Sequence, residues 1–162
     1  MDIRVGLGED SHAFSAEQKI LMLGGVAIPD SPGLAGNSDA DPVLHALCNA
    51  FDVVGGEGSL SAYADEMCAQ GITDSSAYVV HALSSAQKRG WGVVSVSISI
   101  EARRPRLEKY AAAMKKKMAE LLGIEVENIG LTCTSGEGIS GPGKGLGIRV
   151  SAVVLFVRRD KQ

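Results

Sequence analysis

VVSVSISIE, residues 93–101, is the clearest strand pattern in this chain of 162 residues and the main indication of its fold class. Apolar residues alternate there with three serines, and a period of two predicts one buried face and one face in water. The apolar positions are Val94, Val96, Ile98 and Ile100. We therefore expect a strand in a sheet that is covered on one side.

The segments on both sides of this strand carry further strand and helix patterns. Strands are predicted at 3–7, 20–28, 129–134 and 146–158, with a hairpin turn at Gly24–Gly25. Helices are predicted from the Ser38–Asp41 region with Pro42 in the first turn, from Asp74 to Gly90, and from Pro105 to Leu122. Residues 55–73 are ambiguous: a glycine-rich loop and then a weak helix from Tyr63 to Cys68.

Strands and helices mixed in this order predict one α/β (α+β) domain over residues 1–162. The expected architecture is a two-layer sandwich, in which a mixed sheet carries its helices on one face.

Composition argues against several classes of partner. A net charge of −3 and only 4% aromatic residues speak against nucleic-acid binding. No apolar run of about 18 residues predicts a membrane span, and no secretory leader pattern opens the chain. Three scattered cysteines, an odd number, suit a reducing compartment. We expect a cytoplasmic bacterial protein, or one of a plastid-type organelle without its transit peptide.

The segment GEDSHAF, residues 8–14, raises the question of a metal site. Asp10 and His12 are two residues apart, so on an extended chain both point to one side. They are either paired ligands or part of a polar turn. With His45 of the first predicted helix they would form an N,N,O set that leaves the fourth position open, as in catalytic zinc sites.

The other residues near these histidines allow two readings. Asp41, one helical turn before His45, either orients its imidazole or, like Asp39, only favours the helix amino terminus. His81 has no acidic neighbour in its predicted helix and is interpreted as structural.

Two later segments are typical of phosphate binding. TCTSGEGISGPGKGLG, residues 132–147, combines glycines with hydroxyls, Glu137 as a candidate magnesium ligand and Lys144 as a point charge. The alternative is a long hairpin whose glycines only serve turns. IEARRPRLEKY, residues 100–110, either holds a phosphate with its arginines at a helix amino terminus or carries plain surface charges.

Taken in order, these segments resemble the 2-C-methyl-D-erythritol 2,4-cyclodiphosphate synthase family over nearly the whole chain. The resemblance is specific because of the order and spacing of several motifs. They are RVGLGEDSHAF, LMLGGVAIP, GLAGNSDADPVLHAL, GITDSS, IEARRPRL and the last glycine-rich loop.

This resemblance implies a homotrimer with active sites between subunits and a phosphorus–oxygen lyase of non-mevalonate isoprenoid (terpenoid) synthesis. In 4-diphosphocytidyl-2-C-methyl-D-erythritol 2-phosphate, the 2-phosphate attacks the β-phosphorus, the cyclic diphosphate closes and CMP leaves. The physical demand is charge neutralisation and in-line positioning.

The resemblance also implies a role for particular residues. Zn²⁺ or another divalent ion is expected at Asp10, His12 and His45, and Mg²⁺ or Mn²⁺, bound by Glu137, is expected to bridge the diphosphate. The implied catalytic positions are Asn37 and Thr134. The implied substrate contacts are Ser38, Ser135, Gly136 and Lys144. The implied nucleotide contacts are Ala102, Pro105, Arg106, Leu107 and Cys133.

The chain departs from the family at several points. Asn37 stands where the family usually has His, and Lys144 where it commonly has Arg. One residue is added between Thr134 and Glu137. GGEGSLSAYADEMCAQ, residues 55–70, replaces the family's segments for the methylerythritol part. The alternative function is a divergent trimeric protein that binds a cytidine nucleotide or an isoprenoid diphosphate without this activity.

Overall fold

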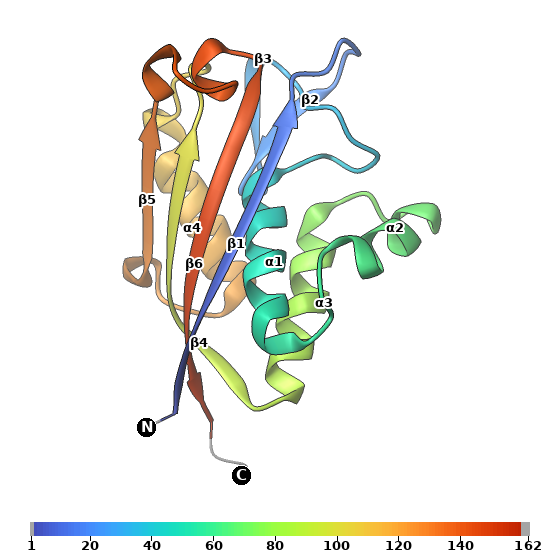
Figure 1. Cartoon of the computed structure of the whole chain (residues 1–162), viewed down its shortest axis with the longest axis vertical. Helices are drawn as coiled ribbons and strands as arrows, with labels where there is room; N and C mark the ends of the chain where they lie inside the picture. Colours follow the sequence, from blue (N-terminus) through green and yellow to red (C-terminus); the bar gives the residue numbers. More distant parts are fainter. Residues whose placement is uncertain (1, 160–162) are drawn as a thin grey trace.

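A computed structural model describes residues 2–159 of the chain (Figure 1). Its main sheet has four strands in the order β1-β6-β4-β5, and a separate hairpin forms a two-stranded sheet. The strands are β1 Ile3–Ala13, β2 Ile20–Leu23, β3 Val26–Pro32, β4 Trp91–Glu101, β5 Ile129–Thr134 and β6 Gly147–Arg158. Strand β4 runs parallel to β5 and antiparallel to β6, so the main sheet is mixed, as predicted.

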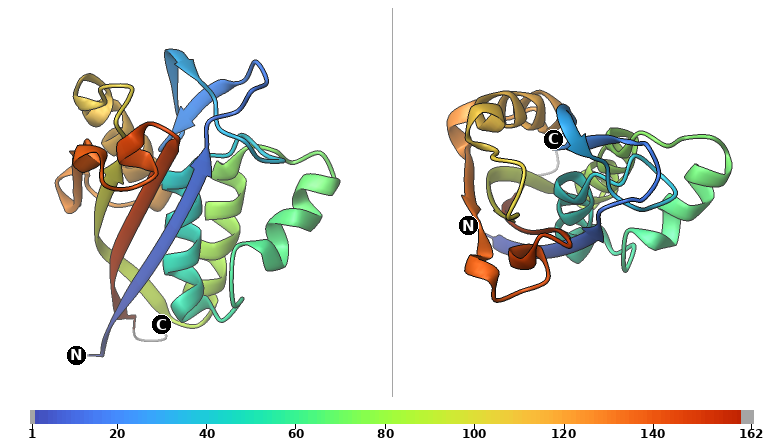
Figure 2. Two further views of the ribbon diagram at one scale, coloured as in Figure 1. Left: turned by 45° about the horizontal axis from the view of Figure 1, so that its top comes forward. Right: turned by 90° about the horizontal axis from the view of Figure 1, so that it is seen from above.

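The helices lie on one face of this sheet (Figure 2). They are α1 Pro42–Gly55, α2 Ser61–Ala69, α3 Ser75–Lys88 and α4 Ala111–Leu122. Short 3₁₀ turns lie at Glu108–Tyr110, Val126–Asn128, Gly136–Gly138 and Pro142–Lys144. Among residues 2–159, no helix combines the length and apolar character that crossing a membrane requires.

Close packing of α1 on β1 places the two elements that carry the candidate metal ligands. Two glycines of β1 face the helix, and a Cβ at Gly6 or Gly8 would lie 2.1 or 2.0 Å from a carbonyl oxygen of α1. Only glycine permits such an approach of two backbones. The helix therefore rests directly on the strand, and its first turn lies beside Asp10 and His12.

The pattern of the β4 strand is confirmed except at its start. Val93 is buried, whereas Val94, predicted to be buried, is 39% exposed. The pairing of β4 with β6 shifts register between Val93 and Ser95. This bulge inserts one residue and reverses the alternation below it, which a regular period of two does not anticipate.

The helix predicted to begin at Pro105 begins six residues later, with α4 at Ala111. Pro105 and Arg106 lie in a loop, and Leu107 is buried in the core at 2% exposure. Burial of Leu107 before the helix begins holds this segment in an irregular path along the end of β4. The prediction at 3–7 was too short, because β1 continues to Ala13 and contains both Asp10 and His12.

Candidate functional site

Helix α1 carries His45 in its first turn because Asp41 fixes where the helix starts. The Asp41 side chain accepts hydrogen bonds from the backbone N–H groups of Val43 and Leu44, as a helix N-cap does. It also accepts from the amides of Gly24 and Gly25 in the β2–β3 turn. Asp41 is therefore the cap, and the alternative that it orients the His45 ring is wrong.

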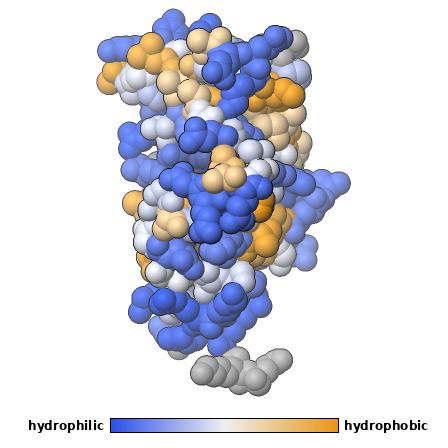
Figure 3. Space-filling model, turned by 90° about the vertical axis from the view of Figure 1, so that its right-hand side faces the viewer, coloured by the Kyte–Doolittle hydropathy of each residue, from blue (hydrophilic) through white to orange (hydrophobic). Residues whose placement is uncertain are grey.

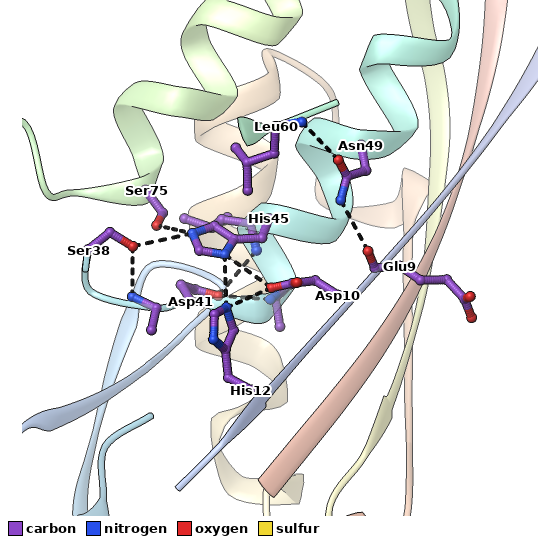
Figure 4. A network of polar contacts seen from close by, with 12 residues as sticks. Glu9, Asp10, His12, Ser38, Asp41, His45, Asn49, Leu60 and Ser75 are labelled. Carbon is purple, nitrogen blue, oxygen red and sulfur yellow. Dashed lines mark hydrogen bonds and ion pairs between the residues drawn. The ribbon is translucent and has the colours of Figure 1, made fainter. Parts of the chain in front are cut away.

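Asp10, His12 and His45 converge, as the sequence predicted (Figure 4). The Oδ2 atom of Asp10 lies 2.9 Å from Nε2 of His12 and 3.0 Å from Nδ1 of His45. The two ring nitrogens are 3.2 Å apart. Ligand atoms around a tetrahedral zinc ion are about 3.3 Å apart, given zinc–ligand distances of about 2.0–2.1 Å. The group has the size and donor chemistry of a metal site.

The charges of this group keep the Asp10 carboxylate ionised beside two imidazoles. Burial alone would raise the pKa of Asp10, but hydrogen bonds from His12 and His45 outweigh it and hold this pKa well below its usual range. The hydrogen bond with Asp10 raises the pKa of His12. A carboxylate that stays ionised and two imidazoles turned toward one point are a suitable set for a divalent ion.

The far side of the His45 ring is held by residues that the sequence analysis did not identify. Nε2 of His45 lies 2.8 Å from Oγ of Ser75, the first residue of α3. The Ser75 hydroxyl donates to the Asp39 carboxylate, so its oxygen accepts from His45. With a metal ion bound in place of the Nδ1 proton, His45 would carry its proton on Nε2 and would present the lone pair of Nδ1 to the ion. The GITDSS motif contained Ser75, but nothing in the sequence linked it to His45.

Replacing Ser75 by alanine should weaken metal binding without unfolding the metal-free protein. The His45 ring would lose the group that fixes its tautomer, and such losses cost about 10–100-fold in metal affinity. Competition with a chelating dye measures this affinity, and thermal unfolding of the metal-free protein tests the fold. Ser76→Ala on the same turn is the control. Equal metal affinities for the two variants would contradict this role of Ser75.

A cavity of about 290 Å³ opens beside the candidate metal group, which consists of Asp10, His12 and His45. Asn37 and Ser38 line it from the loop before α1, and Ser38 Oγ also lies 3.5 Å from Nε2 of His45. Helix α2 forms another wall with Leu60, Ser61, Ala64, Asp65 and Cys68. The Cys68 thiol donates to the carbonyl oxygen of Asn37, which ties α2 to that loop. Residues of the segment 55–73, which was ambiguous in sequence, therefore shape this cavity.

Helix α2 is anchored through Tyr63, whose hydroxyl donates to Asp52 of α1. Burial raises the pKa of Asp52 to about 6, and the charge of Glu57 adds to this, although the Tyr63 hydrogen bond opposes it. The folded protein thus binds this proton more tightly than the unfolded chain does. The associated stabilisation is complete below pH 3.8 and is lost as the pH rises through about 6.

We therefore expect Asp52→Asn to flatten the pH dependence of stability between pH 4 and 7. Asparagine keeps an acceptor for Tyr63 but does not titrate. The difference in the free energy of unfolding between the two proteins should change by on the order of 1–3 kcal/mol over this range. Urea unfolding with a chelator at several pH values measures it. Parallel curves for the two proteins would contradict the raised pKa.

The predicted nucleotide residues come together at a different place, at the ends of β4 and β5. A cavity of about 190 Å³ is lined by Ala102, Pro105, Arg106, Leu107 and Cys133, together with Arg103, Glu108, Thr134 and Ser135. A neighbouring cavity of about 240 Å³ is lined by Arg103, Ser135, Glu137, Gly138 and Gly143. Hydroxyl, carboxylate and guanidinium groups thus surround a small polar hollow there.

The glycine-rich loop is folded compactly around its own side chains. Glu137 has a positive φ of 47° and accepts a hydrogen bond from the Ser135 hydroxyl at 2.5 Å. A Cβ at Gly136 would lie 2.3 Å from the Glu101 carboxylate, so this glycine is required by packing. Lys144 is exposed at the end of the last 3₁₀ turn.

Within one chain the expected site is divided into a metal half, with Asp10, His12 and His45, and a nucleotide half around Cys133 and Thr134. These two halves lie apart. Asp10 and His12 belong to β1, at one edge of the main sheet, and Cys133 and Thr134 belong to β5, at the other edge. Three strand spacings separate these edges, roughly 14 Å. The structure therefore does not bring Glu137 into the Asp10–His12–His45 group of the same chain.

Comparison with known proteins settles the family. Residues 3–157 match the model of the YgbB family. The chain belongs to the YgbB family. The resemblance inferred from the sequence motifs is thereby confirmed.

The curated relatives that match this YgbB-family chain carry the same protein name, and so does one of the similar solved structures below. The 2-C-methyl-D-erythritol 2,4-cyclodiphosphate synthase of Chlamydia trachomatis serovar L2b is 42% identical over 95% of this chain and 88% of the relative. A solved structure of such a synthase in a CDP-bound form is 28% identical, with a TM-score of 0.86 over 95% of this chain and 100% of that one. The bifunctional IspDF from Campylobacter jejuni has a TM-score of 0.90 at 27% identity; the match covers 98% of this chain and 43% of that longer one.

Proposed function

We propose that the protein is a 2-C-methyl-D-erythritol 2,4-cyclodiphosphate synthase. The expected reaction is an intramolecular phosphoryl transfer, a phosphorus–oxygen lyase reaction, in which the 2-phosphate attacks the β-phosphorus and CMP leaves. The observation that carries the proposal is the Asp10–His12–His45 group beside a cavity, in a chain 42% identical to an enzyme of that name. The CDP bound in a similar structure supports a cytidine nucleotide as part of the ligand.

The donor set fits a divalent metal ion, and we propose Zn²⁺ for it. One carboxylate and two imidazoles leave a fourth tetrahedral position for a phosphate oxygen. We propose that Glu137, an exposed carboxylate beside Ser135, holds Mg²⁺ or Mn²⁺ at the diphosphate. When bound, these ions would neutralise charge that builds up on the phosphates.

The chain's own residues are proposed to position the substrate. Thr134 and Ser135 offer hydroxyl donors, and the amides around Gly136 together with Lys144 offer further contacts to phosphate oxygens. Arg106, Pro105 and Leu107 are proposed to hold the cytidine part in the cavity that they share with Cys133 and Ala102.

The methylerythritol part is proposed to lie in the cavity over the metal group. Ser61 and Asp65 of α2 offer a hydroxyl and a carboxylate there, which can hydrogen-bond to a polyol. Asn37 lies on the same cavity and offers an uncharged donor where the family usually has His. We therefore propose that Asn37 helps to orient the attacking phosphate and does not carry charge.

A homotrimer is proposed because one chain does not join the two halves of the site. The face of the main sheet opposite the helices carries exposed apolar side chains on β1 and β6: Ile3, Val5, Leu7 and Val153, from 41% to 59% exposed. A contiguous apolar surface of this kind marks a contact between proteins. Packing of three such faces would set β1 of one subunit near β5 of its neighbour. The bacterial relatives and three free cysteines support a bacterial cytoplasm as the compartment.

The direct test incubates the protein with 4-diphosphocytidyl-2-C-methyl-D-erythritol 2-phosphate, Zn²⁺ and Mg²⁺, and follows CMP by chromatography. We expect CMP and the cyclic diphosphate in equal amounts, and no release when a chelator is present. Binding of the substrate without CMP release would reject the synthase and favour a divergent binding protein.

A further inference from the structure

A second cavity lies at the end of the molecule where the chain's terminal segments meet, far from the metal group. Its volume is about 770 Å³, against about 290 Å³ for the cavity over the metal group. It is bounded by the carboxyl ends of α1 and α3, the starts of β1 and β4, and the end of β6. His45 lies in the first turn of α1, and the eight residues from His45 to Val53, about 12 Å along the helix axis, separate it from the first cavity-lining residue of this helix.

This terminal cavity is strongly basic. Among residues 2–159, five cationic side chains and no carboxylate line it: Arg4, Lys88, Arg89, Arg158 and Arg159. They are five of the chain's 16 lysines and arginines, although the net charge of the chain is −3. Figure 3 shows hydrophilic residues gathered at the lower end of the molecule.

Two of these cations, Arg4 and Arg158, pack on the ring of Trp91. The guanidinium carbons of Arg4 and Arg158 lie 5.2 and 4.7 Å from the ring centre of Trp91, which is only 4% exposed. Arg158 also donates to the carbonyl oxygen of Arg89 and to the Asp2 carboxylate, each at 3.0 Å. Asp2 is the one carboxylate found paired with this cluster in the described part of the chain.

Two glycines make room for the remaining arginines. A Cβ at Gly56 would lie 2.4 Å from Nη2 of Arg89, and one at Gly92 would lie 2.3 Å from Nε of Arg159. Both guanidinium groups therefore lie against bare backbone. Gly56 ends α1 with a φ of 77°, so this position favours glycine for its conformation as well.

Within the described residues, the positive charge of this cavity is only partly compensated. The carboxyl ends of α1 and α3 each act as about half a negative charge, and Asp2 adds one more. These offset about two of the five positive charges in the cavity. A ligand with two or more negative charges would balance the rest.

We propose that this cavity binds the diphosphate group of a small molecule, at a site separate from the proposed active site. A planar guanidinium group can donate two parallel hydrogen bonds to the oxygens of one phosphate. Four arginines line this cavity. The volume suits a small ligand. Trp91 is buried beneath two arginines, so it does not offer a surface on which a nucleobase stacks.

Fluorescence of Trp91, the single tryptophan of the chain, reports on this cavity directly. We would titrate the full chain with inorganic pyrophosphate, in a chelator that removes the divalent ions needed by the proposed active site. We expect a saturable change, larger than that given by potassium chloride of equal ionic strength. Lys88→Gln and Arg89→Gln should each weaken binding by about tenfold, because each removes a charged hydrogen-bond donor. Lys116→Gln on α4 is the matched control and should bind as the wild type does.

Further arms of the titration identify the source of the diphosphate. An alkyl diphosphate or adenosine diphosphate that binds more tightly than pyrophosphate, and is weakened by Arg89→Gln, would support an organic ligand. Equal affinities would support inorganic pyrophosphate. Three outcomes would overturn the proposal. They are a fluorescence response to chloride as large as that to pyrophosphate, wild-type affinity of the Arg89→Gln variant for pyrophosphate, and tighter binding of single-stranded RNA than of pyrophosphate. Failure of the CMP assay would not affect this result, because the site needs neither metal nor substrate.

Discussion

Replacing His45 by alanine is expected to abolish both metal binding and CMP release. The Nδ1 atom of His45 completes the group with Asp10 and His12, and its loss leaves one carboxylate oxygen and one imidazole. Loss of an outer partner already costs about 10–100-fold in metal affinity, so loss of a ligand should cost more than about 100-fold. Metal analysis of the dialysed protein and the CMP assay measure the two effects.

The control for this variant is His81→Ala, which removes a histidine of α3 that lies outside the metal group. This control should retain the metal content of the wild type. Because His45 is 6% exposed and packs under α3, unfolding of the His45→Ala variant must be checked in the metal-free state. Full CMP release by a folded, metal-free His45→Ala protein would contradict the proposed mechanism.

Two inactive variants should restore activity when they are produced together. His45→Ala removes the metal half of a site, and Glu137→Gln removes the half at the glycine-rich loop. If each site takes its halves from two neighbouring subunits, random trimers of the two variants contain intact sites. With equal amounts of both chains, about one quarter of the sites should be intact, and CMP release should reach about that fraction of the wild-type rate.

The matched control combines His45→Ala with His12→Ala, two variants of the same half. No assembly of these two chains contains an intact metal half, so their mixture should stay inactive. An inactive mixture of His45→Ala with Glu137→Gln, formed from trimers that contain both chains, would place the whole site within one subunit. Sedimentation analysis of the wild type tests the trimer independently.

The sequence was sufficient for the local features of the fold. The serine alternation predicted β4, and glycines placed the β2–β3 turn. It failed where a tertiary contact overrode a local pattern: the register shift of β4 against β6 exposed Val94, and burial of Leu107 delayed α4. Neither the bulge nor the buried leucine is encoded within a few residues of its position.

The metal group was predictable because its residues are few and their local geometry is simple. Asp10 and His12 share one side of a strand by its period of two, and His45 follows a recognisable helix start. Helix α1 can approach strand β1 closely because Gly6 and Gly8 have no side chains, so the two backbones come into contact.

The residue patterns alone were enough to identify the chemical groups and the segments that carry them. Three further features became visible only in the folded chain. Ser75, 30 residues after His45, contacts its ring, the two halves of the proposed site lie at opposite edges of the sheet, and five cations share one cavity. The physical reason is that each depends on contacts between elements distant in sequence. Such contacts follow from packing and strand order, which no local pattern of residues contains.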